Sequence, residues 1–467
     1  MVNNRQLNYL IIFFFIGMWI SIGSDPYDYL IIFENQNYKK INLFKFNLEI
    51  IINFVRSIIP YTVLLFSLYI VIKYNIFKDQ KKFIYILFFI QILQLITTLI
   101  SKNSLMSNYE TSIDFIGRFH WVISSISMIL IFMIASKIKN FKFANLFFIS
   151  IFFLTLMVIY FTIKILIDFY TNEITVSVYH LDVMRKSAYF LDHQMPRTTG
   201  LSRSIVLLYI ILFFLNHYLK DYLKYLNYVI LIILGSLIFF FQSKFAFLSY
   251  LIINFIFIFN SSNKIQQLKL FLFLLITQLI LFYGISSSRI IFDKTIIYLD
   301  NSKNLNTPKK KERNVKHFRS FNDTAHKTRM DLIQNVISSG RFNLWQKALV
   351  FVKKRPFSGY GSMSDRHIIN EKRLKNQKLV NPVSNAFIYS ILSGGIFSLL
   401  LFLYFWLSIK EKILNILKLN SRFRYYESVA CVIIFTLGLR CLVENSIMLF
   451  GLDFILILNA LYLTEKT

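Results

Sequence analysis

Long apolar segments alternate with shorter polar stretches along the whole chain, and most of them approach the length of a membrane-spanning helix. Such a helix needs about 20 mainly apolar residues. The predicted spans are 7–23, 54–72, 83–100, 116–135, 146–167, 204–218, 228–242, 245–260, 270–285, 386–407, 427–443 and 447–463. This pattern predicts an all-α, polytopic membrane helix bundle with about twelve transmembrane helices.

Composition excludes a soluble protein. Of the 467 residues, 56% are hydrophobic and 16% are charged, whereas soluble domains carry about 25% charged residues. The two cysteines, Cys431 and Cys441, lie ten residues apart on one predicted helix, so they form neither a disulfide nor a metal site.

The spans and loops predict three parts: nine transmembrane helices in residues 1–285, a large loop at 286–385, and three helices in 386–467. Loops rich in Lys and Arg recur on one side of the predicted membrane, which the positive-inside rule makes the cytoplasmic side. They are 73–82, 137–142, 220–224, 264–269 and 410–424. Both termini are then cytoplasmic, and the 168–203 loop and the large loop lie outside.

The net charge of +28 does not indicate nucleic acid in so apolar a chain. From 286 to 386 there are 21 basic and 7 acidic residues, a net +14. Long loops cross the membrane regardless of charge, so the topology stands. Outside the membrane, such charge attracts anionic lipid headgroups or binds phosphate and pyrophosphate. A solvated basic surface is the alternative reading, and we favour it for the basic run at 309–313.

The second half of the large loop carries predicted structure. After a polar, disordered stretch at 301–322, Asn322 and Asp323 cap one short amphipathic helix. A second helix runs from Arg341 to about Lys354, before a tight turn at 359–361 with exposed amides. Arg341 then sits at a helix N-terminus, where free amides favour anions. With Arg355, Gly359 and Gly361 at the other end of the helix, this arrangement predicts a pyrophosphate site.

Four stretches with their order and spacing resemble the bacterial O-antigen polymerase and O-antigen ligase superfamily. They are Gly-Arg-Phe-Asn-Leu-Trp at 340–345, Arg-Pro-Phe-Ser-Gly-Tyr-Gly at 355–361, Ser-Asn-Ala-Phe-Ile-Tyr at 384–389 and Gly-Gly-Ile at 394–396. Shorter similarities begin at Arg197, before the sixth helix, and at Arg440 and Glu444, near the outer end of the eleventh.

The resemblance implies a glycosyltransferase of the bacterial inner membrane that uses undecaprenyl-pyrophosphate-linked glycan on the periplasmic face, with no metal and no cofactor. For this chemistry Arg197 and Arg341, one from each outer loop, are the catalytic candidates, and Arg203 and Arg355 are secondary candidates for substrate binding. The alternative roles are a snorkelling residue at a helix start for Arg203 and a lipid-surface contact for Arg355. Arginine forks suit the charge that develops on a pyrophosphate leaving group. Membrane lipids and a chain-length regulator are the other expected partners, and nucleic acid is not one.

One departure from the family pattern favours a polymerase over a ligase. Ligases of this family, and many of its polymerases, carry a His-Asn pair before the helix that follows the large loop, and this chain has Ser384-Asn385. His367 is an upstream substitute for that histidine. Asp365 and Arg366 are candidates for acceptor binding or for the base. The general base stays unassigned.

Near the C-terminus, Arg440 and Glu444 are spaced to pair on one helix, and Asp453 falls deep in the last span, where a helix-packing ion pair is expected. Asn385, Arg440 and Glu444 complete the substrate-binding candidates. Three other functions stay open: an O-antigen ligase, a transporter or flippase for lipid-linked sugars, and a non-catalytic scaffold that binds lipid or polymer.

Overall fold

The structure is a computed structural model of the 467-residue chain. It describes residues 5–22, 43–78, 80–106, 112–171, 183–186, 194–197, 199–216, 219–241, 243–260, 263–303, 341–369, 383–414 and 425–464. The chain forms two compact units, one made of Met1–Leu154 with Asn343–Thr467 and the other of Thr155–Phe342. We describe each unit by itself.

The first unit is a helix bundle built around one buried helix. Its elements are α1 (Arg5–Ser21), α3 (Leu43–Lys73), α4 (Lys82–Met106), α5 (Ser112–Lys137), the start of α6 (Phe143–Thr171), α12 (Arg341–Lys354), α13 (Asp365–Ile368), α14 (Ala386–Ser408), α15 (Lys410–Leu414), α16 (Tyr425–Cys441), a 3-10 turn (Ser446–Met448) and α17 (Leu452–Leu463). Helix α5 is the central one, because 83% of its most apolar window is buried against α1, α3, α4 and α17. Stacked rings of Phe132, Phe143 and Tyr462 join three of these helices.

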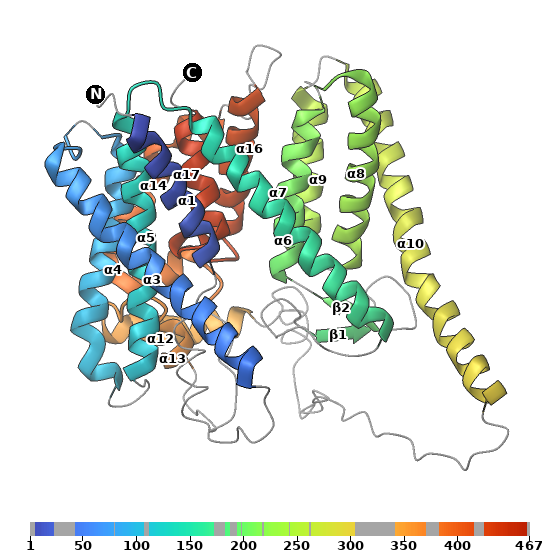
Figure 1. The fold of residues 1–467 in the computed structure, drawn as a ribbon, viewed down its shortest axis with the longest axis horizontal. Coiled ribbons are helices and arrows are strands. Elements are labelled where there is room, and N and C mark those ends of the chain that lie inside the picture. Colours follow the sequence, from blue (N-terminus) through green and yellow to red (C-terminus); the bar gives the residue numbers. More distant parts are fainter. Residues whose placement is uncertain are drawn as a thin grey trace. The chain divides into compact units, whose positions relative to one another are not determined.

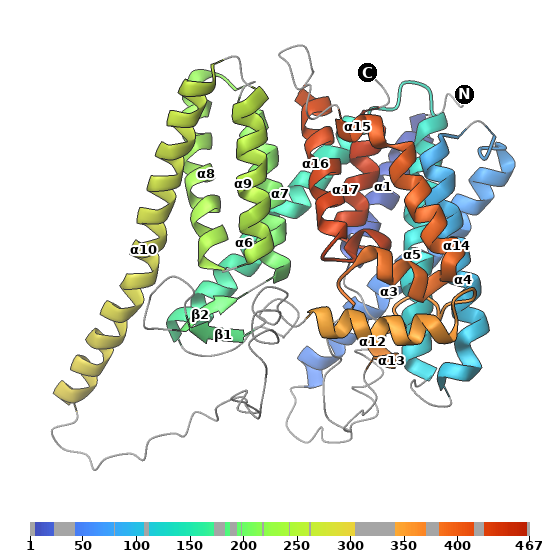
Figure 2. The same cartoon turned by 180° about the vertical axis from the view of Figure 1, so that it is seen from behind.

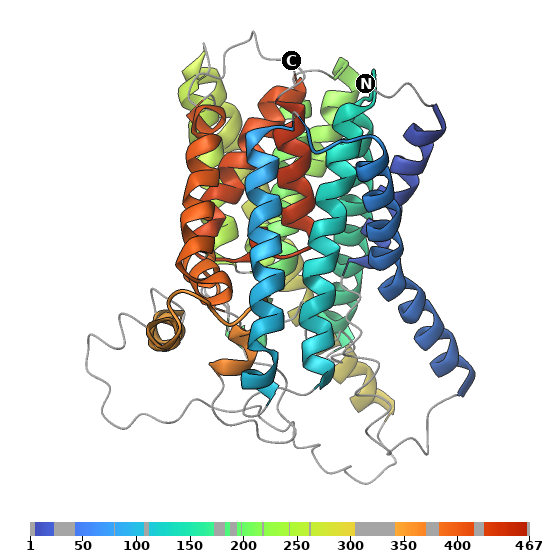
Figure 3. The same cartoon turned by 90° about the vertical axis from the view of Figure 1, so that its left-hand side faces the viewer.

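Helix α12 has a different orientation from the rest of this unit. It lies crosswise to α4, α5 and α14 near one end of these helices, as Figures 1 and 2 show, and Figure 3 views it along its axis. Its buried residues Ala348, Phe351 and Val352 share a hydrophobic cluster with Leu105 of α4 and Leu392 of α14. The motif-bearing helix is therefore held on the ends of two candidate membrane spans.

The second unit holds the rest of α6 with β1 (Val183–Lys186), β2 (Gln194–Arg197), α7 (Thr199–Leu215), α8 (Asp221–Phe240), α9 (Lys244–Asn260) and α10 (Lys264–Lys303). The two strands pair antiparallel, with Val183 opposite Arg197. Gln278 of α10 lies so close to Gly235 of α8 that any side chain at Gly235 would collide with it. Tyr250 donates to the same glutamine at 2.7 Å, and such small-residue contacts and polar bonds hold membrane helices together.

These helices confirm the predicted fold class. Each of the twelve predicted spans coincides with a helix, and among the described residues seven helices are long and apolar enough to cross a membrane. Helix α10 continues to Lys303, so the start of the predicted loop is helical. The short strand pair was not expected. The predicted helix after Asn322 and most of the stretch predicted to be disordered lie outside the described residues.

Candidate functional site

Helix α12 has the limits that the sequence predicts, from Arg341 to Lys354, and Pro356 follows its end. One face packs into the bundle, and the indole nitrogen of Trp345 donates to the carbonyl of Val383 at 2.8 Å. This packing leaves Arg341 half-buried at the helix N-terminus, where the free amides and the dipole favour an anion.

The turn after α12 is docked on α14 by an exchange of backbone hydrogen bonds. Gly395, with φ 70°, interrupts the helical conformation of α14. The amide of Ile396 therefore donates to Pro356 at 2.8 Å. In return, the amides of Tyr360 and Gly361 donate to the carbonyls of Leu392 and Ser393, at 2.8 and 2.7 Å.

The prediction of exposed amides in this turn is wrong. The Gly359 amide also has a partner, the carbonyl of Arg355 at 3.2 Å, and residues 359–361 are buried. Both glycines are needed for another reason. Their φ values are 59° and 87°, and a Cβ at Gly359 would lie 2.7 Å from the Ser393 carbonyl oxygen. The Gly-Tyr-Gly motif therefore docks the turn and presents no amide to a ligand.

A buried arginine from α5 clamps the same turn. Arg118 is 2% exposed, and its guanidinium donates to the carbonyls of Ser362 at 2.6 Å and Tyr360 at 2.5 Å. Two residues of α4 add to the clamp: Ser101 donates to Tyr360 at 2.7 Å, and Thr98 accepts from the Ser362 amide at 2.9 Å. Arg118 is not among the residues that the sequence assigns to the site. Thr98 and Ser101 are polar residues on one face of the apolar helix α4. They were the signal that this face of α4 contacts a polar partner.

Beyond the turn, α13 brings Asp365 and His367 into the interior. Asp365 is 1% exposed, and one carboxylate oxygen accepts from the Val383 amide at 2.8 Å. Its other oxygen has no hydrogen-bond partner among the described residues. Burial raises the pKa of this carboxyl group. His367 is also buried, with Nδ1 3.9 Å from a carboxylate oxygen of Asp114 in α5, while Arg366 is half-buried.

Asn385 caps α14. Its side-chain oxygen accepts from the amides of Phe387 and Ile388 at 3.0 Å each, and its nitrogen donates to the carbonyl of Leu442 at 2.9 Å. An asparagine at this position is among the best N-caps. The polar residue that the family pattern places before this helix therefore has a structural task here, in addition to any contact with substrate.

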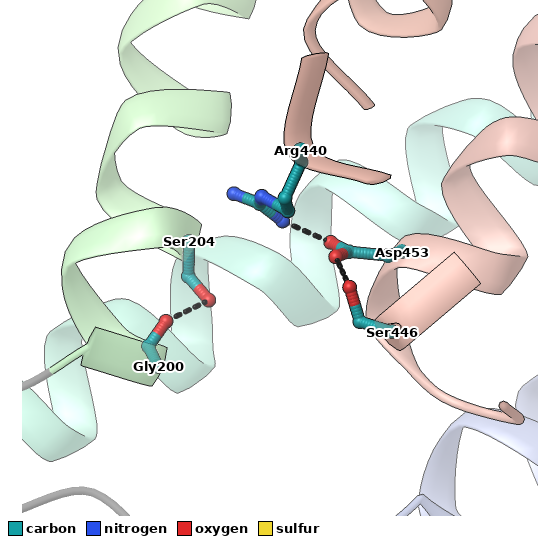
Figure 4. Close-up of polar contacts among 5 residues, drawn as sticks. All are labelled: Gly200, Ser204, Arg440, Ser446 and Asp453. Carbon is teal, nitrogen blue, oxygen red and sulfur yellow. Dashed lines mark hydrogen bonds and ion pairs between the residues drawn. The ribbon is translucent and has the colours of Figure 1, made fainter. Parts of the chain in front are cut away.

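Arg440 forms a buried ion pair with Asp453, whose other oxygen accepts from Ser446 (Figure 4). The expected helix-packing ion pair is therefore present. The expected spacing is wrong in two respects: α16 ends at Cys441, so Glu444 does not follow Arg440 on one helix, and Asp453 lies in the first turn of α17. Figure 4 also shows the Ser204–Gly200 bond within α7 of the other unit.

The four candidate arginines are not equivalent. Arg197 ends β2 and the half-buried Arg203 lies in α7, both in the second unit. Arg341 and Arg355 are separated by the length of α12, about 21 Å at 1.5 Å per residue. Arg355 stacks over the Tyr360 ring at 5.1 Å. One pyrophosphate therefore does not bridge the two ends of α12, contrary to the prediction. Among the described residues, no group of three His, Cys, Asp or Glu side chains could hold a metal ion.

One comparison with protein families found a match that includes most of this arrangement. Residues 198–403 match the family described as O-antigen ligase. This part of the chain is similar to that family. The family consists of membrane glycan-processing enzymes, and the match confirms the resemblance drawn from the motifs. The O-antigen ligase domain contains Arg203, α12, the docked turn and Asn385, but begins one residue after Arg197. No curated protein and no solved structure matches the chain.

Proposed function

We propose that this chain is a membrane glycosyltransferase that polymerises undecaprenyl-pyrophosphate-linked oligosaccharide repeat units on the periplasmic face of the bacterial inner membrane. The product would be an O-antigen, a capsule or an exopolysaccharide. One observation carries the proposal: within the region that matches the family, α12 is docked across the ends of α4 and α14 with Arg341 at its N-terminus. A site at the ends of these helices suits a substrate whose lipid lies in the bilayer and whose sugar lies outside it.

The reaction needs a leaving group stabilised by positive charge. A hydroxyl of the acceptor sugar attacks the anomeric carbon of the donor glycan, the bond from that carbon to the pyrophosphate oxygen breaks, and the electron pair stays on the pyrophosphate. The hydroxyl proton passes to a base. Arginine forks placed at the pyrophosphate stabilise the developing charge. We assign this task to Arg341 and Arg197, and binding of the carrier or the glycan to Arg203, Arg355 and Arg366.

The residues before α14 favour a polymerase over a ligase. The family's histidine position holds Ser384, and the neighbouring Asn385 is engaged in capping α14. His367, the upstream candidate for this role, is buried beside Asp114. A ligase that transfers glycan to lipid A core is the second candidate. In the polymerase, a chain-length regulator is the expected protein partner.

The orientation of the first unit supports a periplasmic site. Helix α12 lies at one end of this unit, whereas α1 begins and α17 ends at the other (Figure 1). The basic loop at 73–82 joins α3 to α4. If that loop is cytoplasmic by the positive-inside rule, α12 faces the periplasm.

Arg341 variants in a strain that lacks the chromosomal gene test the proposal. Loss of one preorganised donor to a developing charge costs roughly 10²–10³-fold in rate. Arg341→Ala should therefore leave single repeats where wild type makes a long glycan ladder, and Arg341→Lys should recover part of it. Lys139→Ala removes the same charge from an exposed position outside α12 and should keep the ladder.

The lipid-linked fraction separates the candidates. Long glycan stranded on the undecaprenyl carrier would identify a ligase, and a normal ladder with Arg341→Ala would refute the role of Arg341. Purified protein that moves a labelled lipid-linked sugar between leaflets without joining units would identify a flippase instead. If purified protein neither joins nor moves repeat units, the non-catalytic scaffold is the function that remains.

A further inference from the structure

Helix α12 has three different faces. The packed face consists of Leu344, Ala348, Phe351 and Val352. A second face is apolar yet exposed: Phe342 and Leu349 lie seven residues apart, so they share one side of the helix, and they are 40% and 45% exposed. The third face is mainly polar, with Asn343, Gln346, Lys347 and Lys354, and it also carries the exposed Val350. A helix whose outer side met only water would have just a packed face and a polar face. The exposed apolar face therefore indicates an apolar partner.

The charge on α12 indicates what kind of partner this is. From residue 341 to 355 there are five basic residues and no acidic one. Lys353 and Lys354 lie in the last turn, where the negative end of the helix dipole stabilises a positive charge. Lys347 lies in the middle of the helix, where the dipole does not stabilise its charge. An exposed apolar stripe beside a lysine-rich face is the pattern of a helix that lies in the plane of a membrane interface.

The packing of α12 places it at that depth. Its cluster partners are Leu105, next to the last residue of α4, and Ile388, Ile391 and Leu392, in the first two turns of α14. Helix α14 has 23 residues and is about 35 Å long, whereas the hydrocarbon layer is about 30 Å thick. Its first turn therefore lies at the edge of the hydrocarbon layer. The crosswise course of α12 keeps the whole helix at this level (Figures 2 and 3).

We propose that α12 is an interfacial helix, whose Phe342 and Leu349 insert at the boundary of the acyl chains while Lys347, Lys353 and Lys354 bind anionic phospholipid headgroups. The partner is the bilayer itself, and the interaction needs no glycan substrate. Each basic residue near an anionic surface contributes to this attraction, and the contribution weakens over the Debye length as salt is added. The lipid contact would hold the N-terminal end of α12, and with it Arg341, at a constant depth.

Spin labels on the full-length protein in lipid nanodiscs test the proposal. Leu349→Cys reports the apolar face, and Asn343→Cys is the matched control on the polar face of the same helix. The native cysteines, Cys431 and Cys441, are buried and do not compete for the label. The 349 label should be reached by oxygen and shielded from a water-soluble nickel complex, and the 343 label should show the reverse. Equal nickel access at both positions would overturn the insertion.

Lipid composition tests the lysines. Phosphatidylglycerol added to phosphatidylcholine nanodiscs should move the 349 label deeper, and 1 M salt should reverse the shift. The triple variant Lys347→Ala, Lys353→Ala, Lys354→Ala should lose this dependence on phosphatidylglycerol while keeping the native melting transition. Depth that is unaffected by phosphatidylglycerol in the wild type would overturn the anionic-lipid contact. These measurements contain no donor glycan, so their failure is separate from failure of the proposed polymerase.

Discussion

Replacing Gly361 with alanine should undock the turn that joins α12 to α13. The backbone there has φ 87°, a conformation that costs a residue with a Cβ about 1–2 kcal/mol. The added methyl group would lie 2.5 Å from Thr98 Cα and 2.6 Å from Thr98 Oγ1, and closer still to the Arg118 guanidinium. Forcing a methyl into such a packed site costs about 1–3 kcal/mol more. The expected loss of stability is therefore about 2–5 kcal/mol.

The structure also indicates how this loss would appear. Displacing the turn strains the Arg118 bonds to Tyr360 and Ser362 and the two amide bonds to α14. We expect a lower melting temperature in detergent, followed with a thiol-reactive dye because both cysteines become accessible only on unfolding. The glycan ladder should shorten as well, since a shift of about 1 Å in a catalytic group can cost roughly 10²-fold in rate.

A matched glycine variant provides the control. Gly284 lies inside α10 with no atom within 4 Å of an added Cβ, so Gly284→Ala should keep or raise the melting temperature. If Gly361→Ala melts and polymerises like wild type while Gly284→Ala does the same, the turn is not packed against Arg118 and Thr98, and the reasoning fails.

Two further predictions concern buried charges. Because burial raises the pKa of Asp365 from 3.8, the folded state holds its proton to higher pH than the unfolded chain, so its contribution to stability falls as pH rises above about 3.8 through the raised pKa. Asp365→Asn should flatten this decline in melting temperature, and an unchanged slope would contradict it. Arg440→Met should destabilise the fold by about 3–5 kcal/mol, because it removes the countercharge of the buried Asp453, and adding Asp453→Leu should restore most of the loss. A double variant as unstable as the single one would refute that explanation.

Local patterns predicted the helices well. The spans follow from apolar length alone, and the limits of α12 follow from its periodicity and from Pro356. The end of α16 was misplaced because residues after Cys441 are still largely apolar, although the chain leaves the helix there. That one error produced the incorrect Arg440–Glu444 spacing, since an i, i+4 argument holds only inside a helix.

The contacts that build the site were beyond such patterns. Arg118 and Tyr360 are 242 residues apart in sequence, and nothing local to either indicates the other. Likewise, the turn amides seemed available for a ligand because the interruption of α14 at Gly395 was not expected. Because α14 is interrupted there, its carbonyl groups accept hydrogen bonds from the turn amides, which are then not available to a ligand. The domain division and the roles of Arg197 and Arg203 stay predictions.

The family motif therefore divides into two sets of residues with different physical tasks. Gly359, Gly361 and Gly395 meet where the turn crosses α14, and each holds a positive φ at a point where a side chain would collide with backbone. Their pattern specifies a docked cap and carries no ligand chemistry. Arg341 satisfies no such packing rule: a cation at a helix N-terminus opposes the dipole. Arg341, on a cap held in place by glycines and by Arg118, is the residue of this motif to which we assign the anion.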